Sequence, residues 1–179
     1  MRIISGKYKG KRLIAPKTLP VRPTTDFAKE ALFNILNHRI AFSETEFLDL
    51  FAGTGNISFE MASRGATVIT AVDADFGCVK YIQKISSELD FGIHAIKADV
   101  FSFLEKNKQP FDVIFADPPY DFTVEQFEKI ITAIFENNLI KPDGFLVIEH
   151  SKHTDLSLVK QFSEERKYGG SKFSFFNFS

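Results

Sequence analysis

Short apolar stretches alternate with amphipathic stretches from residue 47 onward, and this alternation is the strongest structural pattern in the chain. The apolar stretches predict five strands, at 47–50, 67–72, 93–97, 113–116 and 144–149. The amphipathic stretches predict four helices, at 56–64, 76–89, 100–106 and 123–136. Such alternation is typical of an α/β fold, in which helices cover both faces of a mostly parallel sheet.

The two ends of the chain depart from this alternation. Residues 1–22 predict two short strands separated by glycines, in a small β-hairpin extension that continues into a proline-containing linker. A helix is expected to begin near Thr24, with apolar positions on one face through Leu36. The aromatic stretch 173–178 predicts a final, antiparallel strand. We therefore expect the extension at 1–22 and one α/β domain at 23–179.

Composition narrows the class of protein. A chain of 179 residues with 44% hydrophobic content can form one domain with a sizeable core. Cys78 is the only cysteine, which excludes an intramolecular disulfide and fits a reducing cytoplasm. No apolar run approaches the ~20 residues of a membrane-spanning helix, and the start of the chain becomes polar too early for a signal peptide. We expect a cytoplasmic protein that does not associate with membranes.

Charge is unevenly distributed, although the net charge is only −1. The first 22 residues contain no acid and seven bases: Arg2, Lys7, Lys9, Lys11, Arg12, Lys17 and Arg22. Such a cluster has two interpretations, a solvated face or a surface that grips a phosphate backbone. The acidic remainder argues against a protein that coats nucleic acid indiscriminately.

A glycine-containing turn follows the first predicted strand, in the stretch Asp49-Leu50-Phe51-Ala52-Gly53-Thr54-Gly55. Ligands of open parallel sheets bind beyond the carboxyl ends of the strands, and glycine lets the backbone approach them closely. The third glycine of the dinucleotide fingerprint is missing, because position 58 is Ser. A carboxylate at Asp49 favours a cationic ligand, so S-adenosylmethionine, with its ammonium and sulfonium, fits better than NAD.

Two more carboxylates stand at the ends of the next strands. Asp73 can accept hydrogen bonds from both ribose hydroxyls of a nucleoside cofactor. Asp99 can accept one from an adenine amino group, while the Val100 N–H serves a ring nitrogen. The alternative for each carboxylate is a helix N-cap, and Asp75 is the better cap candidate for the helix after Asp73.

The fourth predicted strand leads into the turn Asp117-Pro118-Pro119-Tyr120, which predicts the chemical step. Proline fixes φ and lacks an N–H donor, so the turn is stiff. The Asp117 carboxylate and the Pro118 carbonyl can both accept hydrogen bonds from one exocyclic amine of a nucleobase. This directs the nitrogen lone pair at a sulfonium methyl group, while Tyr120 stacks on the base. The alternative is an ordinary proline turn.

No second chemical site is predicted. The four histidines, His38, His94, His150 and His153, lack the spacing of a ligand set. Cys78 lies within a predicted helix without a paired base, so we expect it to pack in the core. We therefore expect no metal.

Over nearly its full length, the chain resembles the bacterial 16S ribosomal RNA guanine-N2 methyltransferases of the RsmD type. The most specific similarity is N-terminal, in Arg2-Ile3-Ile4-Ser5-Gly6 and Lys9-Gly10-Lys11-Arg12-Leu13. It continues through Arg22-Pro23-Thr24-Thr25-Asp26 and Lys29-Glu30-Ala31-Leu32-Phe33-Asn34. The two turns described above occur in many methyltransferases.

The resemblance implies a fold, a cofactor and a substrate. The fold is a Rossmann-like S-adenosylmethionine-dependent methyltransferase domain with a mostly parallel seven-stranded sheet. The reaction methylates one guanine of 16S rRNA in an assembled or assembling small subunit and releases S-adenosylhomocysteine. The resemblance places Arg22, Thr24 and Asn34 near the target pocket. From the charge cluster we expect Lys9, Lys11 and Arg12 to bind the substrate, and from the turn chemistry Pro119 and Tyr120. We expect a monomer.

Two other functions stay open. An adenine-N6 nucleic-acid methyltransferase would use the same turn chemistry. Such enzymes also have tyrosine at the position that Tyr120 occupies here. The chain lacks an insertion large enough to read a DNA sequence. A non-catalytic RNA-binding assembly factor is the third possibility, and the complete set of site residues argues against it.

Overall fold

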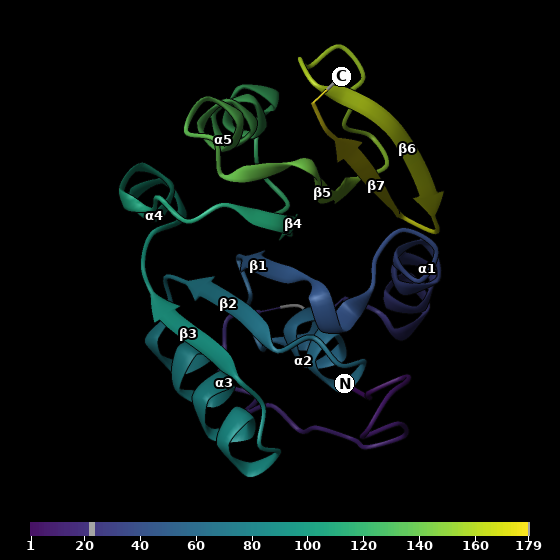
Figure 1. Ribbon diagram of the computed structural model, residues 1–179, viewed down its shortest axis with the longest axis vertical. Helices are drawn as coiled ribbons and strands as arrows, with labels where there is room; N and C mark the ends of the chain where they lie inside the picture. Colours follow the sequence, from purple (N-terminus) through teal and green to yellow (C-terminus); the bar gives the residue numbers. More distant parts are fainter. Residues whose placement is uncertain (22–23, 179) are drawn as a thin grey trace.

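The computed structural model describes residues 1–21 and 24–178, which form one seven-stranded sheet with helices on both faces (Figure 1). The strand order is β3-β2-β1-β4-β5-β7-β6. Strands β1 to β5 are parallel, and β7 runs antiparallel to both of its neighbours. The strands are β1 (Glu46–Leu50), β2 (Val68–Asp73), β3 (Ile93–Lys97), β4 (Phe111–Ala116), β5 (Ile140–Ser151), β6 (Phe162–Tyr168) and β7 (Ser171–Phe176).

The helices divide between the two faces, and each face has its own core. One core packs α1 (Asp26–Leu36), α2 (Asn56–Ser63) and α3 (Phe76–Glu88) against the sheet. The other packs α4 (Val100–Lys106) and α5 (Val124–Glu136). Successive strand side chains point to opposite faces, so Phe47 belongs to the first core and Leu48 to the second. The described elements also include a short 3₁₀ helix, η1 (Phe42–Glu44).

The observed elements confirm the predicted alternation of strands and helices. Two differences concern strands β5 and β6, which lie beyond β4 in the sheet. Strand β5 begins at Ile140, four residues before the predicted start, and its register against β4 shifts between Phe111 and Val113. Strand β6 was not predicted, because its sequence is polar and no side chain in it is fully buried. An edge strand needs little apolar surface, so it lacks the pattern that identified the inner strands.

The N-terminal segment forms a hairpin with one antiparallel bridge, between Arg2 and Arg12, where two short strands were expected. Its apolar residues Ile3 and Leu13 are buried in the core beside α1 and α2. Three further contacts tie it to later parts of the chain. The Lys7 N–H donates to Ser63 O, the Tyr8 N–H to Ser63 Oγ, and the Tyr8 hydroxyl to Leu89 O.

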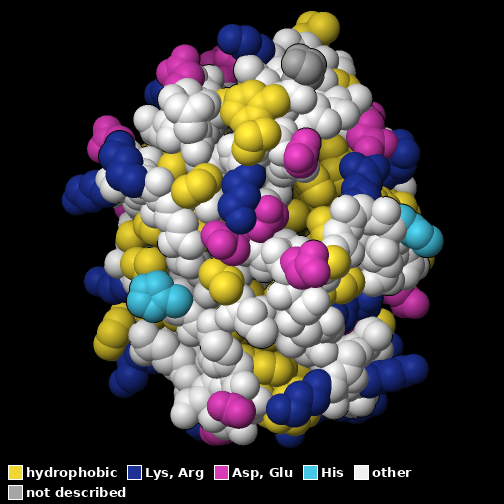
Figure 2. All heavy atoms as spheres, in the orientation of Figure 1, with side chains coloured by type: hydrophobic (Ala, Val, Ile, Leu, Met, Phe, Trp, Pro, Cys, Tyr) yellow, Lys and Arg dark blue, Asp and Glu magenta, His cyan; other side chains and the backbone are white. Residues whose placement is uncertain are grey.

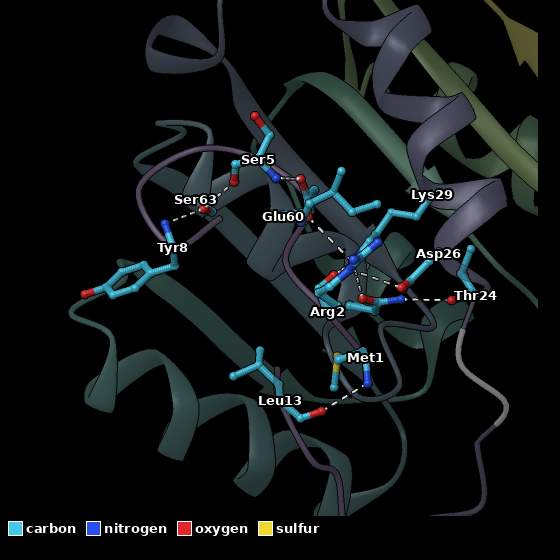
Figure 3. A network of polar contacts seen from close by, with 12 residues as sticks. Met1, Arg2, Ser5, Tyr8, Leu13, Thr24, Asp26, Lys29, Glu60 and Ser63 are labelled. Atoms are coloured by element: carbon cyan, nitrogen blue, oxygen red, sulfur yellow. Dashed lines mark hydrogen bonds and ion pairs between the residues drawn. The ribbon is translucent and has the colours of Figure 1, made fainter. Parts of the chain in front are cut away.

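A buried polar network fixes this segment to α1 and α2 (Figure 3). The Glu60 carboxylate is fully buried and accepts hydrogen bonds from the N–H groups of Ile4 and Ser5, at 2.8 and 3.0 Å. Arg64 Nε lies 2.8 Å from the same carboxylate. Lys29 Nζ lies 3.6 Å from Glu60 Oε2, and the Lys29 side chain is 1% exposed. Burial lowers the pKa of Lys29, and the neighbouring Glu60 carboxylate opposes that shift.

The described surface has two general properties. No helix within residues 1–21 and 24–178 is long and apolar enough to cross a membrane. On the face shown in Figure 2, basic and acidic side chains are interspersed. This face therefore carries no large surface of a single charge.

Replacing Lys29 with Met should reduce the free energy of unfolding by roughly 3–5 kcal/mol, because Glu60 would keep a buried charge with one cation fewer. Urea unfolding of the variant measures this loss. The matched control is Lys84→Met, which removes an exposed pair with Glu88 on α3. The control should change stability little. Equal losses in the two variants would contradict the role given to Lys29.

Candidate active site

The strand register brings three acidic residues to one edge of the sheet. Leu50 of β1 pairs with Val72 of β2 on one side and with Ala116 of β4 on the other. Asp73 therefore ends β2 beside the β1 turn, and Asp117 follows β4 on its other side. Ala116 in turn pairs with Ile148 of β5, which places Glu149 next to Asp117. This is the edge where ligands bind in open parallel sheets.

A cleft of about 820 Å³ opens along this edge. Its first half is formed beyond β1, β2 and β3 by Asp49, Phe51, Ala52, Gly53, Asp73, Ala74, Asp75, Asp99 and Val100. Its second half is formed beyond β4, β5 and β7 by Thr24, Phe27, Asp117, Pro118, Pro119, Tyr120, Glu149, Tyr168 and Ser171. Its volume is in the range of small-molecule and cofactor sites.

The two glycines of the first turn have different roles. Both have positive φ, 54° at Gly53 and 77° at Gly55. Gly53 lines the cleft, and a Cβ added there would lie 3.4 Å from Val21 Cγ1, an ordinary contact. Gly55 is buried away from the cleft, and a Cβ added there would lie 2.8 Å from Ile82 Cγ1. Gly55 thus lets α2 pack against α3. Gly53 leaves its own backbone accessible to a ligand in the cleft.

Asp49 lies at the floor of the first half. It is 2% exposed, and Ser58 Oγ donates a hydrogen bond to its Oδ2 at 2.6 Å. Burial raises the pKa of Asp49 to about 7, and the hydrogen bonds from Ser58 oppose that shift. Because charged groups are costly to bury without a partner, a cation entering the cleft would favour the ionised carboxylate.

Asp73 is held rigidly by the turns beside it. Its Oδ2 accepts a hydrogen bond from the Gly53 N–H and its Oδ1 accepts one from the Asp75 N–H, both at 2.8 Å. A carboxylate has about four acceptor sites, so both oxygens can also receive donors from a ligand in the cleft. The helix cap at α3 is Asp75, which accepts from the Cys78 N–H. The prediction that Asp75 is the better cap is confirmed.

Asp99 caps a helix and also lines the cleft. It caps α4, because its Oδ1 accepts a hydrogen bond from the Ser102 N–H at 3.0 Å. It also lines the cleft together with Val100, beyond β3. Capping by one oxygen therefore does not remove Asp99 from the candidate cofactor residues.

The turn after β4 presents its polar groups into the second half of the cleft. Asp117 is partly buried, Pro118 is buried, and Tyr120 is 73% exposed. Desolvation raises the pKa of Asp117 well above its usual range, and the carboxylates of Glu149 and Asp49 raise it further. A hydrogen bond with Thr24 opposes this shift. An acidic group and an exposed aromatic ring therefore flank the space where a base could enter.

The expected substrate contacts do not all meet at the cleft. Thr24, Pro119 and Tyr120 line it. Lys9, Lys11 and Arg12 are exposed on the N-terminal hairpin and do not line it, and Asn34 is exposed on α1. Arg22 lies outside the described residues.

Glu149 and the aromatic residues Phe27 and Tyr168 are cleft residues that the sequence analysis missed. Glu149 follows the same rule as Asp73 and Asp117, since it comes late in a parallel strand, and that rule could have identified it. Tyr168 could not be placed without strand β6. Its ring contacts Phe27 edge-on, with centroids 6.3 Å apart, at the rim of the cleft.

No group of three or more His, Cys, Asp or Glu side chains in residues 1–21 and 24–178 is arranged to hold a metal ion.

Comparison with known proteins identifies the family. Residues 1–177 match the family described as Conserved hypothetical protein 95. The chain belongs to this family. Ribosomal RNA small subunit methyltransferase D of Haemophilus influenzae is 35% identical over 161 residues, which is 87% of this chain and 81% of that protein. Its Escherichia coli K12 counterpart is 30% identical over 160 residues, 89% of this chain and 79% of that protein. The resemblance to the RsmD-type methyltransferases is thereby confirmed.

Solved structures agree with this assignment. The putative methyltransferase yhhF of Escherichia coli superimposes with a TM-score of 0.85 at 28% identity, covering 98% of this chain and 96% of that one. A 16S rRNA methyltransferase of Thermus thermophilus, RsmC, solved with AdoMet and guanosine, gives a TM-score of 0.71 at 21% identity. That match covers 89% of this chain and 45% of RsmC, and it supports the fold. The expected methyltransferase fold is confirmed.

Gly55→Ala should lower the free energy of unfolding by roughly 1–3 kcal/mol through overpacking against Ile82, in addition to the strain of positive φ. Gly53→Ala carries the same kind of φ strain without the steric clash, so its loss should be smaller. Urea unfolding of both variants measures the difference. A loss at Gly53 that equals or exceeds the loss at Gly55 would show that the glycines do not divide as described.

Proposed function

We propose that this chain transfers the methyl group of S-adenosylmethionine to the exocyclic N2 amine of a guanine in 16S rRNA. One observation carries the proposal: the glycine turn after β1 and the Asp117-Pro118-Pro119-Tyr120 turn after β4 open into the same cleft. The first turn suits a nucleoside cofactor and the second suits an amine-bearing base. Adjacent placement of the two is what direct methyl transfer requires.

The first half of the cleft fits S-adenosylmethionine. Asp73 has acceptor sites for the two ribose hydroxyls, on oxygens already oriented by backbone N–H groups. Asp99 and Val100 border the space beyond β3, where the adenine would lie. Asp49 supplies a buried carboxylate for the cationic end of the cofactor. When bound, the cofactor supplies an electrophilic methyl group on sulfur.

The second half of the cleft positions the amine. The Asp117 carboxylate and the Pro118 carbonyl accept hydrogen bonds from the two N–H groups of guanine N2, and they thereby aim the nitrogen lone pair at the methyl carbon. Bound S-adenosylmethionine would supply the methyl group: an N–CH₃ bond would form as the S–CH₃ bond breaks, and S-adenosylhomocysteine would be released. The methylated nitrogen then loses a proton, and Asp117 is positioned to receive it. Tyr120 stacks on the base, a contact worth ~1–3 kcal/mol in nucleic-acid complexes.

Several features support an RNA substrate. The relatives from Haemophilus influenzae and Escherichia coli are named as ribosomal RNA small subunit methyltransferases. The exposed bases Lys9, Lys11 and Arg12 lie on the N-terminal hairpin, where they could contact phosphates outside the cleft. Arg22 and Asn34 are proposed as further contacts on the strength of the family resemblance. We infer that the substrate is an assembled or assembling small subunit, and that the enzyme acts as a monomer in the cytoplasm.

Cofactor affinity should depend on pH through Asp49. Its pKa of about 7 is above the usual value, so at lower pH the carboxyl must lose a proton before a cation can pair with it. The affinity for S-adenosylhomocysteine, measured by calorimetry, should therefore rise with pH from 5.5 to 7, by up to about tenfold per pH unit. Asp49→Asn should bind more weakly at pH 7 and lose most of this slope. The control, Glu88→Gln on α3, should keep both affinity and slope, and an unchanged slope in Asp49→Asn would contradict the assignment.

Methyl transfer should depend on Asp117. Asp117→Ala should bind S-adenosylhomocysteine normally yet transfer methyl on the order of 10²–10³ times more slowly, because one positioned acceptor is lost. Tyr120→Phe should be mild and Tyr120→Ala severe, because stacking survives only in the former. The assay uses labelled S-adenosylmethionine with unmodified small-subunit particles, followed by nucleoside analysis. Label in N2-methylguanosine is the expected product, and label in N6-methyladenosine would reject the guanine assignment.

A further inference from the structure

We propose that Glu149 selects guanine by accepting a hydrogen bond from its N1–H, while Asp117 and the Pro118 carbonyl hold the adjacent N2 amine. This inference rests on the proposed function and assigns a specificity-determining residue within the same cleft. Glu149 is 9% exposed, and it lines the cleft together with Asp117.

The placement of Glu149 follows from the sheet. Because Ala116 pairs with Ile148, the next residues, Asp117 and Glu149, occupy matching positions on neighbouring strands. Neighbouring strands are about 4.8 Å apart, so both side chains can reach one edge of the same base. The two carboxyl groups also border a second, small cavity of about 30 Å³ behind the Asp117 turn.

The partners of Glu149 are hydroxyl groups. Thr24 Oγ1 donates to Glu149 Oε2 at 3.3 Å, and Ser171 also hydrogen-bonds to this carboxylate. A buried carboxylate is costly unless donors reach it, so the donors available to Glu149 decide how this side chain is held.

Thr24 leaves room for a donor from the ligand. Its hydroxyl donates to Glu149 and also lowers the pKa of Asp117, yet a hydroxyl has only one proton to donate. It cannot satisfy two ionised carboxylates together. Burial raises the pKa of Glu149, and the hydroxyl groups of Ser171 and Thr24 oppose that shift. Donors supplied by a bound base would complete the set.

Guanine has two neighbouring hydrogen-bond donors that match the two carboxylates. Its Watson–Crick edge presents N1–H next to the N2 amine, so adjacent acceptors on Asp117 and Glu149 match it. Adenine presents a lone pair at N1, which an ionised Glu149 would repel. The same contact would therefore distinguish guanine from adenine, the distinction that Tyr120 does not make.

The test compares bases that differ at N1. Guanosine, 6-thioguanosine and 2-aminopurine riboside are each titrated into the chain saturated with S-adenosylhomocysteine, and binding is measured by NMR. All three probes carry the N2 amine, but 2-aminopurine has no N1–H, and 6-thioguanosine controls for the loss of O6. The parent should bind guanosine and 6-thioguanosine about tenfold or more tightly than 2-aminopurine riboside. Glu149→Gln should reduce this preference to about twofold or reverse it, because its amide can donate to N1.

Matched controls separate selection from folding. Glu165→Gln, on β6 outside the cleft, should keep the parental preference, and Glu149→Gln should keep the parental affinity for S-adenosylhomocysteine. A parent that binds no guanosine, or that does not prefer it, would overturn the role of Glu149, and so would a Glu149→Gln variant with the parental preference. Methyl transfer by the parent to small-subunit particles is measured in parallel. If N2-methylguanosine forms while the preference test fails, the Glu149 inference fails alone; if it does not form, the proposed function fails.

Discussion

The buried ammonium of Lys29 is the interaction on which the candidate site depends. It donates hydrogen bonds to Arg2 O of the N-terminal hairpin and to Asn56 Oδ1 at the start of α2, and it pairs with Glu60. Asn56 in turn donates from Nδ2 to Thr24 O at 3.0 Å. Thr24 then contacts Glu149 in the cleft. One cation thus connects the hairpin, two helices and the cleft.

Such a network imposes a strict requirement on its members. Inside an apolar core each polar group must have a partner, because an unpaired one costs about 1–3 kcal/mol and a charge costs more. Glu60 satisfies this requirement by accepting from two backbone N–H groups and pairing with two cations. The position of Thr24 is therefore determined by the same contacts that hold the hairpin. Stability of the N-terminal segment and geometry of the cleft are linked.

The sequence predicted those parts of the structure that follow from local patterns. Strand ends, the Gly53 turn and the Asp75 cap were all predicted from periodicity and residue chemistry. Strand β6 was missed because an edge strand carries little apolar signal. Lys29 could not be identified either: a lysine among apolar positions of a helix resembles a solvated residue, and only its distant partners explain its burial. Glu149 could have been predicted, because it lies near the carboxyl end of a parallel strand, as Asp73 does.

The contacts of the N-terminal hairpin have a consequence for synthesis. Residues of the hairpin have partners that are synthesised later: Ile4 bonds to Glu60, 56 residues further on, and Tyr8 bonds to Leu89, 81 residues further on. The central strand β1 likewise can pair along both of its edges only after β4 has been synthesised. A growing chain therefore keeps this basic segment unpaired until α2 and α3 have been synthesised, and chaperones or RNA that meet the nascent chain find it accessible during that time.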